Sequence, residues 1–189
     1  MIIGAIEAGG TKFICGLGDE KGNVLEKVSF PTTTPEETMK QVIKYFKDKK
    51  FDAMGIGSFG PINPIKSTEK DGYILKTPKA HWSNYDILGE LKKHFDVPME
   101  FDTDVNGAAL AESWIGAGEG LKNVMYITVG TGIGAGAVVD GKMLHGLSHP
   151  EMGHINVKRH SQDNYEGKCP FHKDCLEGLA AGPAIEARW

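Results

Sequence analysis

The sequence predicts an α/β protein with a mixed sheet, and three observations support that prediction. Three strand-like segments open the chain and are joined by short turns, which is typical of antiparallel hairpins. Helical and strand-like segments then alternate along most of the remaining chain. The composition is that of a globular protein, because 40% of the 189 residues are hydrophobic and 24% are charged.

Each expected element has its own local signal. The expected strands span residues 2–8, 13–17, 24–30, 52–58, 99–103, 122–129 and 133–139. The first helix has clear N-terminal signals, with Thr34 as N-cap, Pro35 as first residue and Glu37 completing a capping box. Further helices are expected from residue 87, over residues 106–115 and from residue 182. The long loop at residues 59–83 is of a kind that is usually functional or mobile.

Charge and cysteine content narrow the class of protein. A net charge of -4 offers no electrostatic footprint for nucleic acid. Met1 leads directly into a strand-like segment, and no apolar run is long enough to span a bilayer, so we expect neither a signal peptide nor a membrane partner. Three cysteines without an export signal favour a reducing compartment, and we expect the cytoplasm.

Two glycine turns each join a pair of strand-like segments. They read Glu7-Ala8-Gly9-Gly10-Thr11-Lys12 and Gly130-Thr131-Gly132-Ile133-Gly134. Turns of this kind present successive backbone N–H groups and can bind an anion. Either turn alone is most simply a β-turn, but two similar turns in one chain favour two phosphate-binding loops.

A carboxylate lies where an expected strand ends and a helix begins, in Asp102-Thr103-Asp104-Val105-Asn106. Ligands gather at the carboxyl ends of strands in α/β folds, so Asp104 is a candidate for chemistry. The simpler interpretation is that Asp104 only caps the helix.

A His/Cys cluster is the sharpest chemical signal that needs no family. Cys169, His172 and Cys175 stand at three-residue spacing, and His154 lies fifteen residues before Cys169. Two thiolates and two imidazoles suit tetrahedral Zn²⁺, and four protein ligands indicate a structural site. The alternative is a chance grouping of surface residues.

These motifs together resemble the ROK family of sugar kinases. The first turn resembles its D-x-G-G-T-K loop, with Glu7 in place of the usual Asp, and the second resembles its G-T-G-x-G-x-G loop. Asp104 and Asn106 match its D-x-N-x-A motif, whereas Thr103 stands where glucokinases of the family usually carry Asn. The C-x-x-H-x-x-C spacing resembles the fructokinase branch.

The resemblance implies a fold and a set of roles. The fold would be the actin-like (ribonuclease-H-like) two-domain fold, with residues 1–118 as first domain and residues 119–189 as an incomplete second one. Asp104 would be the catalytic base. ATP and Mg²⁺ would be bound by Glu7, Gly9, Gly10, Thr11, Lys12, Gly130, Thr131, Gly132 and Gly134. The sugar would be contacted by Thr103, Asn106, Glu151, His154 and Glu177, and Zn²⁺ would be bound by His154, Cys169, His172 and Cys175.

The implied activity is ATP-dependent phosphorylation of fructose to fructose 6-phosphate, by a homodimer at full length. The 189 residues alone are expected to be inactive. Alternatives are a kinase for glucose, mannose or N-acetylmannosamine, and a non-catalytic sugar-responsive regulator. The regulator is disfavoured because the first turn starts at Glu7, which leaves no room before it for a helix-turn-helix.

Overall fold

The computed structural model describes residues 1–66, 68–147 and 149–189. The chain divides into two compact units. Unit 1 comprises residues 1–107 with 146–149, and unit 2 comprises residues 108–145 with 150–189. Each unit contains its own sheet, and the domain boundary expected after residue 118 stays a prediction.

A five-stranded mixed sheet forms the centre of unit 1, as the sequence predicted. Its strand order is β3-β2-β1-β4-β7, with antiparallel pairing from β3 to β1 and parallel pairing from β1 to β7. The strands are β1 (Ile2–Ala8), β2 (Lys12–Asp19), β3 (Val24–Pro31), β4 (Ala53–Ser58) and β7 (Met99–Thr103). The parallel half places the carboxyl ends of β1, β4 and β7 at the same edge.

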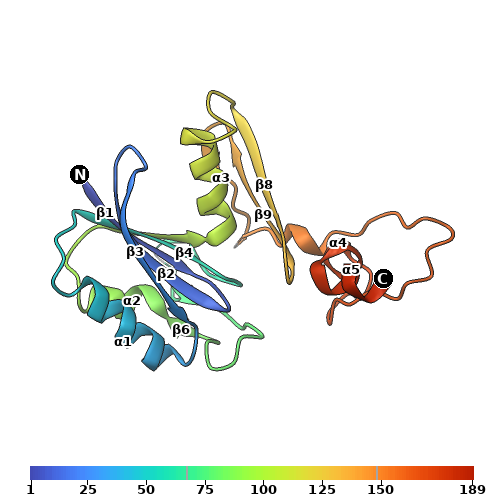
Figure 1. Ribbon diagram of the computed structural model, residues 1–189, viewed down its shortest axis with the longest axis horizontal. Helices are drawn as coiled ribbons and strands as arrows, with labels where there is room; N and C mark the ends of the chain where they lie inside the picture. Colours follow the sequence, from blue (N-terminus) through green and yellow to red (C-terminus); the bar gives the residue numbers. More distant parts are fainter. Residues whose placement is uncertain (67, 148) are drawn as a thin grey trace. The chain divides into compact units, whose positions relative to one another are not determined.

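Two helices, α1 (Pro35–Phe46) and α2 (Ile87–Lys92), pack on one face of this sheet (Figure 1). Thr34 caps α1, because its hydroxyl accepts a hydrogen bond from the Glu37 N–H at 3.4 Å. The core between helices and sheet includes Phe13 of β2 and Phe46 of α1, both fully buried. This confirms the predicted helix start and gives the sheet one firmly packed face.

The loop predicted at residues 59–83 carries more order than expected. It contains β5 (Tyr73–Ile74), which pairs with β6 (Tyr85–Asp86) just after it. Trp82 is fully buried, and its indole N–H donates to the Thr33 carbonyl at 2.8 Å. Trp82 is therefore a core residue that fastens the loop to the start of α1.

The third helix, α3 (Asp104–Ile115), begins two residues before its predicted start at Asn106. The reason is the cap. The Thr103 hydroxyl accepts a hydrogen bond from the Asn106 N–H at 3.1 Å, which is the bond that an N-cap makes to the third helical residue. Thr103 therefore serves as the cap, and Asp104 occupies the first helical position with its carboxylate available for another role.

Unit 2 contains a three-stranded sheet of order β10-β9-β8, formed by β8 (Asn123–Val129), β9 (Ile133–Val139) and β10 (Lys142–Met143). The predicted β8–β9 hairpin is confirmed. The sequence predicted no helix between residues 139 and 182, but the 3-10 helix η1 (Met152–His154) and α4 (Leu176–Ala180) precede α5 (Gly182–Arg188). Such short helices carry too little periodicity for the sequence to reveal them.

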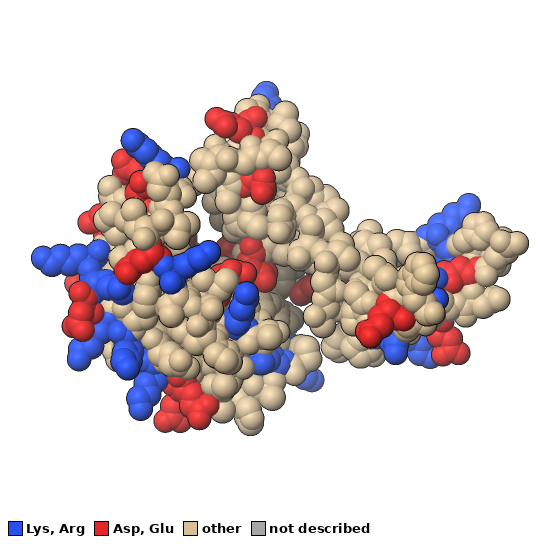
Figure 2. Space-filling model, viewed as in Figure 1, with Lys and Arg blue, Asp and Glu red and all other residues tan. Residues whose placement is uncertain are grey.

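Charged side chains of both signs cover the outside of unit 1. Figure 2 shows Lys and Arg standing among Asp and Glu over its visible face. Among the described residues, every helix is too short or too polar to cross a lipid bilayer.

Candidate functional site

Three residues lie side by side near the carboxyl ends of the parallel strands β1, β4 and β7 in unit 1. Glu7 of β1 pairs with Gly57 of β4, and Gly57 pairs with Asp102 of β7. Paired residues of parallel strands point to the same face, and at Glu7 that face is exposed. The Glu7 carboxylate therefore lies on the face of the sheet opposite the α1 side.

Asp104 lies on this same face, directly over Gly57. A Cβ atom built on Gly57 would be 3.3 Å from the Asp104 Cα and 3.7 Å from the Asp104 backbone nitrogen. That contact is tighter than most Cβ contacts in proteins, so the absence of a side chain at Gly57 lets α3 begin close against β4. Sheet register and this contact together bring Asp104 near Glu7.

The surroundings of Asp104 favour proton uptake. Burial raises the pKa of the Asp104 carboxyl, and the negative charge of Glu7 raises it further. The Val105 N–H, which donates to the carboxylate at 2.9 Å, and the nearby His149 lower the same pKa, but the net direction is upward. A carboxylate with a raised pKa is a better proton acceptor than an ordinary aspartate.

The residues around Asp104 are held by a buried hydrogen-bond network. The Asp102 Oδ1 accepts from the Asn106 side-chain amide at 2.9 Å and from the Thr103 N–H at 2.7 Å. Asp102, Thr103 and Asn106 are all buried. The network fixes the end of β7 to the first turn of α3, and it occupies two residues that the resemblance assigned to the sugar.

The first glycine turn is tightly closed. The Gly9 N–H donates to the Lys12 carbonyl at 3.1 Å, and a Cβ atom on Gly9 would lie 2.5 Å from that oxygen, so only glycine fits here. The Thr32 hydroxyl donates to the Gly9 carbonyl at 2.7 Å and anchors the turn to the end of β3. Gly10 is exposed, and a Cβ atom on it would meet no other atom within 4 Å. The outer side of the turn is thus open to a ligand.

The second glycine turn, in unit 2, is held by Glu177. The Gly130 N–H donates to the Gly132 carbonyl at 2.9 Å, which closes the turn. The Glu177 carboxylate accepts from the Ile133 N–H at 2.9 Å. The resemblance assigned Glu177 to the sugar, and the structure places its carboxylate against the second glycine turn.

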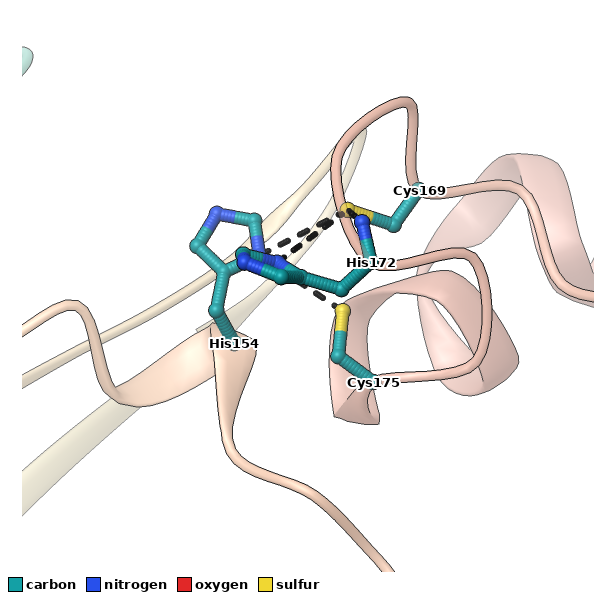
Figure 3. A group of neighbouring side chains, drawn as sticks. All are labelled: His154, Cys169, His172 and Cys175. Carbon is teal, nitrogen blue, oxygen red and sulfur yellow. Dashed lines mark hydrogen bonds between the residues drawn. The ribbon is translucent and has the colours of Figure 1, made fainter.

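His154, Cys169, His172 and Cys175 converge in unit 2, as their spacing predicted (Figure 3). One ligand atom from each lies within 4.8 Å of all the others. His154 comes from η1, Cys169 and His172 from the following loop, and Cys175 from the residue before α4.

The spacing of the donor atoms fits tetrahedral zinc. The His154 Nδ1 lies 3.6 Å from the Cys169 Sγ and 3.5 Å from the Cys175 Sγ, and the His172 Nδ1 lies 3.9 Å from the Cys169 Sγ. Ligands bound to one Zn²⁺ at about 2.0–2.3 Å stand about 3.3–3.8 Å apart in a tetrahedron, so the two His154 distances lie in this range and the His172 distance is slightly longer. Cys169 and Cys175 are buried, which suits a structural site.

Glu151 is a further predicted site residue, in unit 2. It is exposed and lies just before η1, where its carbonyl accepts from the His154 N–H at 3.0 Å. Sequence reasoning missed Gly57 and Asp102 as supports of Asp104. Gly57 stands in an ordinary strand pattern, so only its close contact reveals it.

Comparison with known proteins defines the class to which this fold and these turns belong. The fold matches a ROK hexokinase from Thermus thermophilus (TM-score 0.80, 30% identity, 100% of this chain and 63% of that one). It also matches a ROK glucokinase from Streptomyces griseus in complex with glucose and AMPPNP (TM-score 0.79, 27% identity, 98% and 59%). A ROK transcriptional regulator, a homologue of the E. coli MLC protein, matches at TM-score 0.80 and 22% identity over 99% of this chain and 48% of that one, which shows the fold alone. The chain has the actin-like fold of ROK sugar kinases over the part that it covers.

The sequence comparisons give the family. The ROK family model matches residues 3–189, so the chain belongs to the ROK family. It is 54% identical to a candidate fructokinase of Bacillus subtilis strain 168 (100% of this chain, 63% of that protein) and 50% identical to a fructokinase of Lactococcus lactis subsp. cremoris (98% and 63%). A glucokinase of Halalkalibacterium halodurans is 31% identical (95% and 56%). The chain spans about 63% of the length of the fructokinase relatives.

Proposed function

We propose that this sequence belongs to an enzyme that transfers the γ-phosphoryl group of ATP to the 6-hydroxyl of fructose. The observation that carries the proposal is that the chain is more similar in sequence to fructokinases than to glucokinases. Proteins named fructokinase match at about 50% over nearly the whole chain, whereas a glucokinase matches at 31%. The regulator alternative is less favoured, because the chain has both glycine turns and the Asp104 carboxylate that phosphoryl transfer would use.

Asp104 is the proposed general base. The fructose hydroxyl oxygen forms a bond to the γ-phosphorus, the bond from that phosphorus to the bridging oxygen breaks, and ADP leaves with its electron pair. The hydroxyl proton goes to the Asp104 carboxylate. The raised pKa of Asp104 supports this assignment, because it favours proton uptake as the new bond forms.

The phosphates are the proposed ligands of the glycine turns. Backbone N–H groups of Gly10 and Thr11 and the Lys12 ammonium would bind them at the first turn, and Gly130, Thr131, Gly132 and Gly134 at the second. Glu7, close to Asp104, would hold Mg²⁺, directly or through water. When bound, Mg²⁺ neutralises charge that develops on the transferred group.

Fructose is the proposed ligand of Thr103, Asn106, Glu151, His154 and Glu177. His154 presents Nδ1 to the thiols, so only its other ring nitrogen is left for a sugar hydroxyl. We propose Zn²⁺ at the His/Cys cluster, with the role of ordering the loop that carries these groups. A homodimer at full length and a cytoplasmic location stay predictions; the three free thiols suit a reducing compartment.

A panel of hexoses tests the substrate. A protein of the relatives' full length that carries this sequence would be assayed with ATP and Mg²⁺ on fructose, glucose, mannose and N-acetylmannosamine. We expect the highest kcat/KM for fructose. A higher value for any other sugar would replace fructose as the substrate, and no transfer to any sugar would favour the regulator.

The 189-residue chain alone is expected to have no measurable kinase activity. It also exposes Met125, Ile127 and Val129 of β8, at 59%, 55% and 57%, and such an apolar surface favours self-association. Activity assays and light scattering on the chain beside the full-length form check both points. Normal turnover by a monomer of the chain would contradict this prediction.

Replacing Gly57 by alanine is expected to lower kcat by about 10-fold, because the new methyl group forces Asp104 to shift by a few tenths of an ångström. Gly55 provides the matched control. It lies on the same strand and face, and a Cβ atom there would meet no other atom within 4 Å. Gly55→Ala should keep normal kcat. Equal kcat values for the two variants would show that Gly57 does not position Asp104.

A further inference from the structure

Neighbours of the His/Cys cluster residues contact the second glycine turn at one residue, Ile133. The Ile133 N–H donates to the Glu177 carboxylate at 2.9 Å, and Glu177 stands two residues after Cys175. On the other side of the same residue, η1 lies so close to the Ile133 carbonyl that a Cβ atom on Gly153 would overlap it. Gly153 directly precedes His154. The segments next to His154 and Cys175 therefore contact both the N–H and the carbonyl of Ile133.

A third contact reaches the opposite end of the turn. The Gly182 N–H, at the start of α5, donates to the Gly130 carbonyl at 2.7 Å. A Cβ atom on Gly182 would lie 2.8 Å from that oxygen. Helix α5 follows α4 after a single residue, Ala181. The position of α4 is thus transmitted to both ends of the turn.

The cluster residues in turn determine where α4 begins. The Leu176 N–H donates to the Ile155 carbonyl at 3.0 Å, and Asn156 forms a bridge with Cys175. These bonds join the chain after His154 to the chain at Cys175. An ion shared by His154 and Cys175 would strengthen the same junction, and losing it would loosen α4 and Glu177.

The Glu177 carboxylate lies in the space that a side chain at Gly132 of the second glycine turn would occupy. A Cβ atom on Gly132 would lie 2.6 Å from the Glu177 Oε2, within the contact distance of the two atoms. Glycine at this position therefore admits the carboxylate to the Ile133 N–H. The carboxylate is a charged acceptor, and hydrogen bonds to charged groups are the stronger ones.

We infer that Glu177 is a positioning residue for the second glycine turn and that it couples the order of this turn to metal occupancy of the His/Cys cluster. The functional consequence rests on the proposed phosphate-binding role of the turn. Binding of metal would tighten nucleotide binding, and by reciprocity nucleotide would tighten metal binding by the same factor.

Amide hydrogen exchange of Ile133, followed by NMR in the 189-residue chain, tests the coupling without any activity assay. In zinc-loaded protein, Glu177→Ala should raise the exchange rate of the Ile133 amide by about 10- to 100-fold. Removing zinc from the unsubstituted chain should raise it similarly, and removing zinc from Glu177→Ala should add little. Glu177→Gln keeps a side-chain oxygen acceptor and should restore most of the protection.

The controls separate this role from a general loss of structure. Exchange of the amides in the middle of β9 should stay unchanged in Glu177→Ala, and Glu186→Ala, an exposed change on α5, should leave Ile133 protected. Unaltered Ile133 exchange in Glu177→Ala, or on zinc removal, would overturn the inference. A changed fructose KM with unaltered Ile133 exchange would also overturn it and assign Glu177 to the sugar.

Nucleotide affinity of the full-length form distinguishes the inference from the proposed function. If Glu177→Ala speeds exchange of the Ile133 amide and weakens ADP binding, both the coupling and the phosphate-binding role of the second turn are supported. If it loosens Ile133 and leaves ADP affinity unchanged, the coupling stands and the phosphate-binding role of the second turn fails.

Discussion

Replacing Asp104 by asparagine in the full-length protein is expected to lower kcat by about 10²–10⁴-fold, the usual range for loss of a general base. The amide has nearly the same shape as the carboxylate but cannot take up the hydroxyl proton. Affinity for ATP should be retained, because the glycine turns are unchanged, and the KM for fructose should change less than kcat. Steady-state kinetics with isothermal titration of nucleotide measures all three quantities.

Stability gives an independent check on the same variant. The folded-state pKa of Asp104 is raised above its unfolded value, so its ionised form destabilises the fold, and stability is lost as the pH rises through that pKa. Asparagine carries no charge, so Asp104→Asn should unfold at an equal or higher temperature than the parent at pH 7. The difference should shrink as the pH falls below about 3.9, where the carboxyl is neutral in both states.

Asp48→Asn, an exposed change outside the site, is the matched control and should leave kcat unaltered. Asp102→Asn is not neutral, because the Asp102 carboxylate is buried and bonded to Asn106. If Asp102→Asn abolished turnover while Asp104→Asn kept it, the base would be Asp102. If neither change affected turnover, the proposed mechanism would be wrong.

Stripping zinc from the chain is expected to lower its unfolding temperature by about 5–10 °C. Free metal at a hundredfold excess over its Kd stabilises a folded protein by about 2.7 kcal/mol, and each kcal/mol is worth about 2–4 °C at this size. Thermal unfolding with and without a chelator measures the shift, and elemental analysis should find about one zinc per chain. In the full-length form, sugar binding should weaken together with stability.

Cys169→Ser should reproduce the chelated state, because Cys169 is buried in the cluster and serine is a poor zinc ligand. His160→Ala, on the same loop but outside the cluster, is the control and should retain metal. An unfolding temperature that is the same for Cys169→Ser and the parent, or a chain that holds no metal, would exclude a structural zinc site.

The sequence predicted the strands and long helices because their signals are local. Alternation gave β1 to β4, and the Thr34 cap gave the start of α1. It also grouped the four His/Cys residues, since their short spacing and ligand chemistry point to a shared ion. The sequence was sufficient to predict those features that a few neighbouring residues determine, such as a strand, a helix cap or a closely spaced ligand group.

The sequence could not predict features that depend on contacts between distant segments. The contact of Gly57 with Asp104 joins a residue of β4 to the first residue of α3, and nothing near Gly57 in the sequence indicates it. Glu177 reaches Ile133 across 44 positions, so its role as a partner of the glycine turn had no local signal. The start of α3 was misjudged because Thr103 and Asp104 are both good caps, and only the fold selects Thr103.

The position of the transferred phosphate shows whether the enzyme phosphorylates the 6-hydroxyl of fructose and whether Asp104 takes part in that transfer. The full-length protein would be incubated with ATP, Mg²⁺ and ¹³C-labelled fructose, and the product examined by ³¹P and ¹³C NMR. We expect coupling of phosphorus to C6 of fructose, with this product lost in Asp104→Asn and retained in Asp48→Asn. A phosphate on any other carbon, or full formation of fructose 6-phosphate by the Asp104→Asn variant, would contradict it.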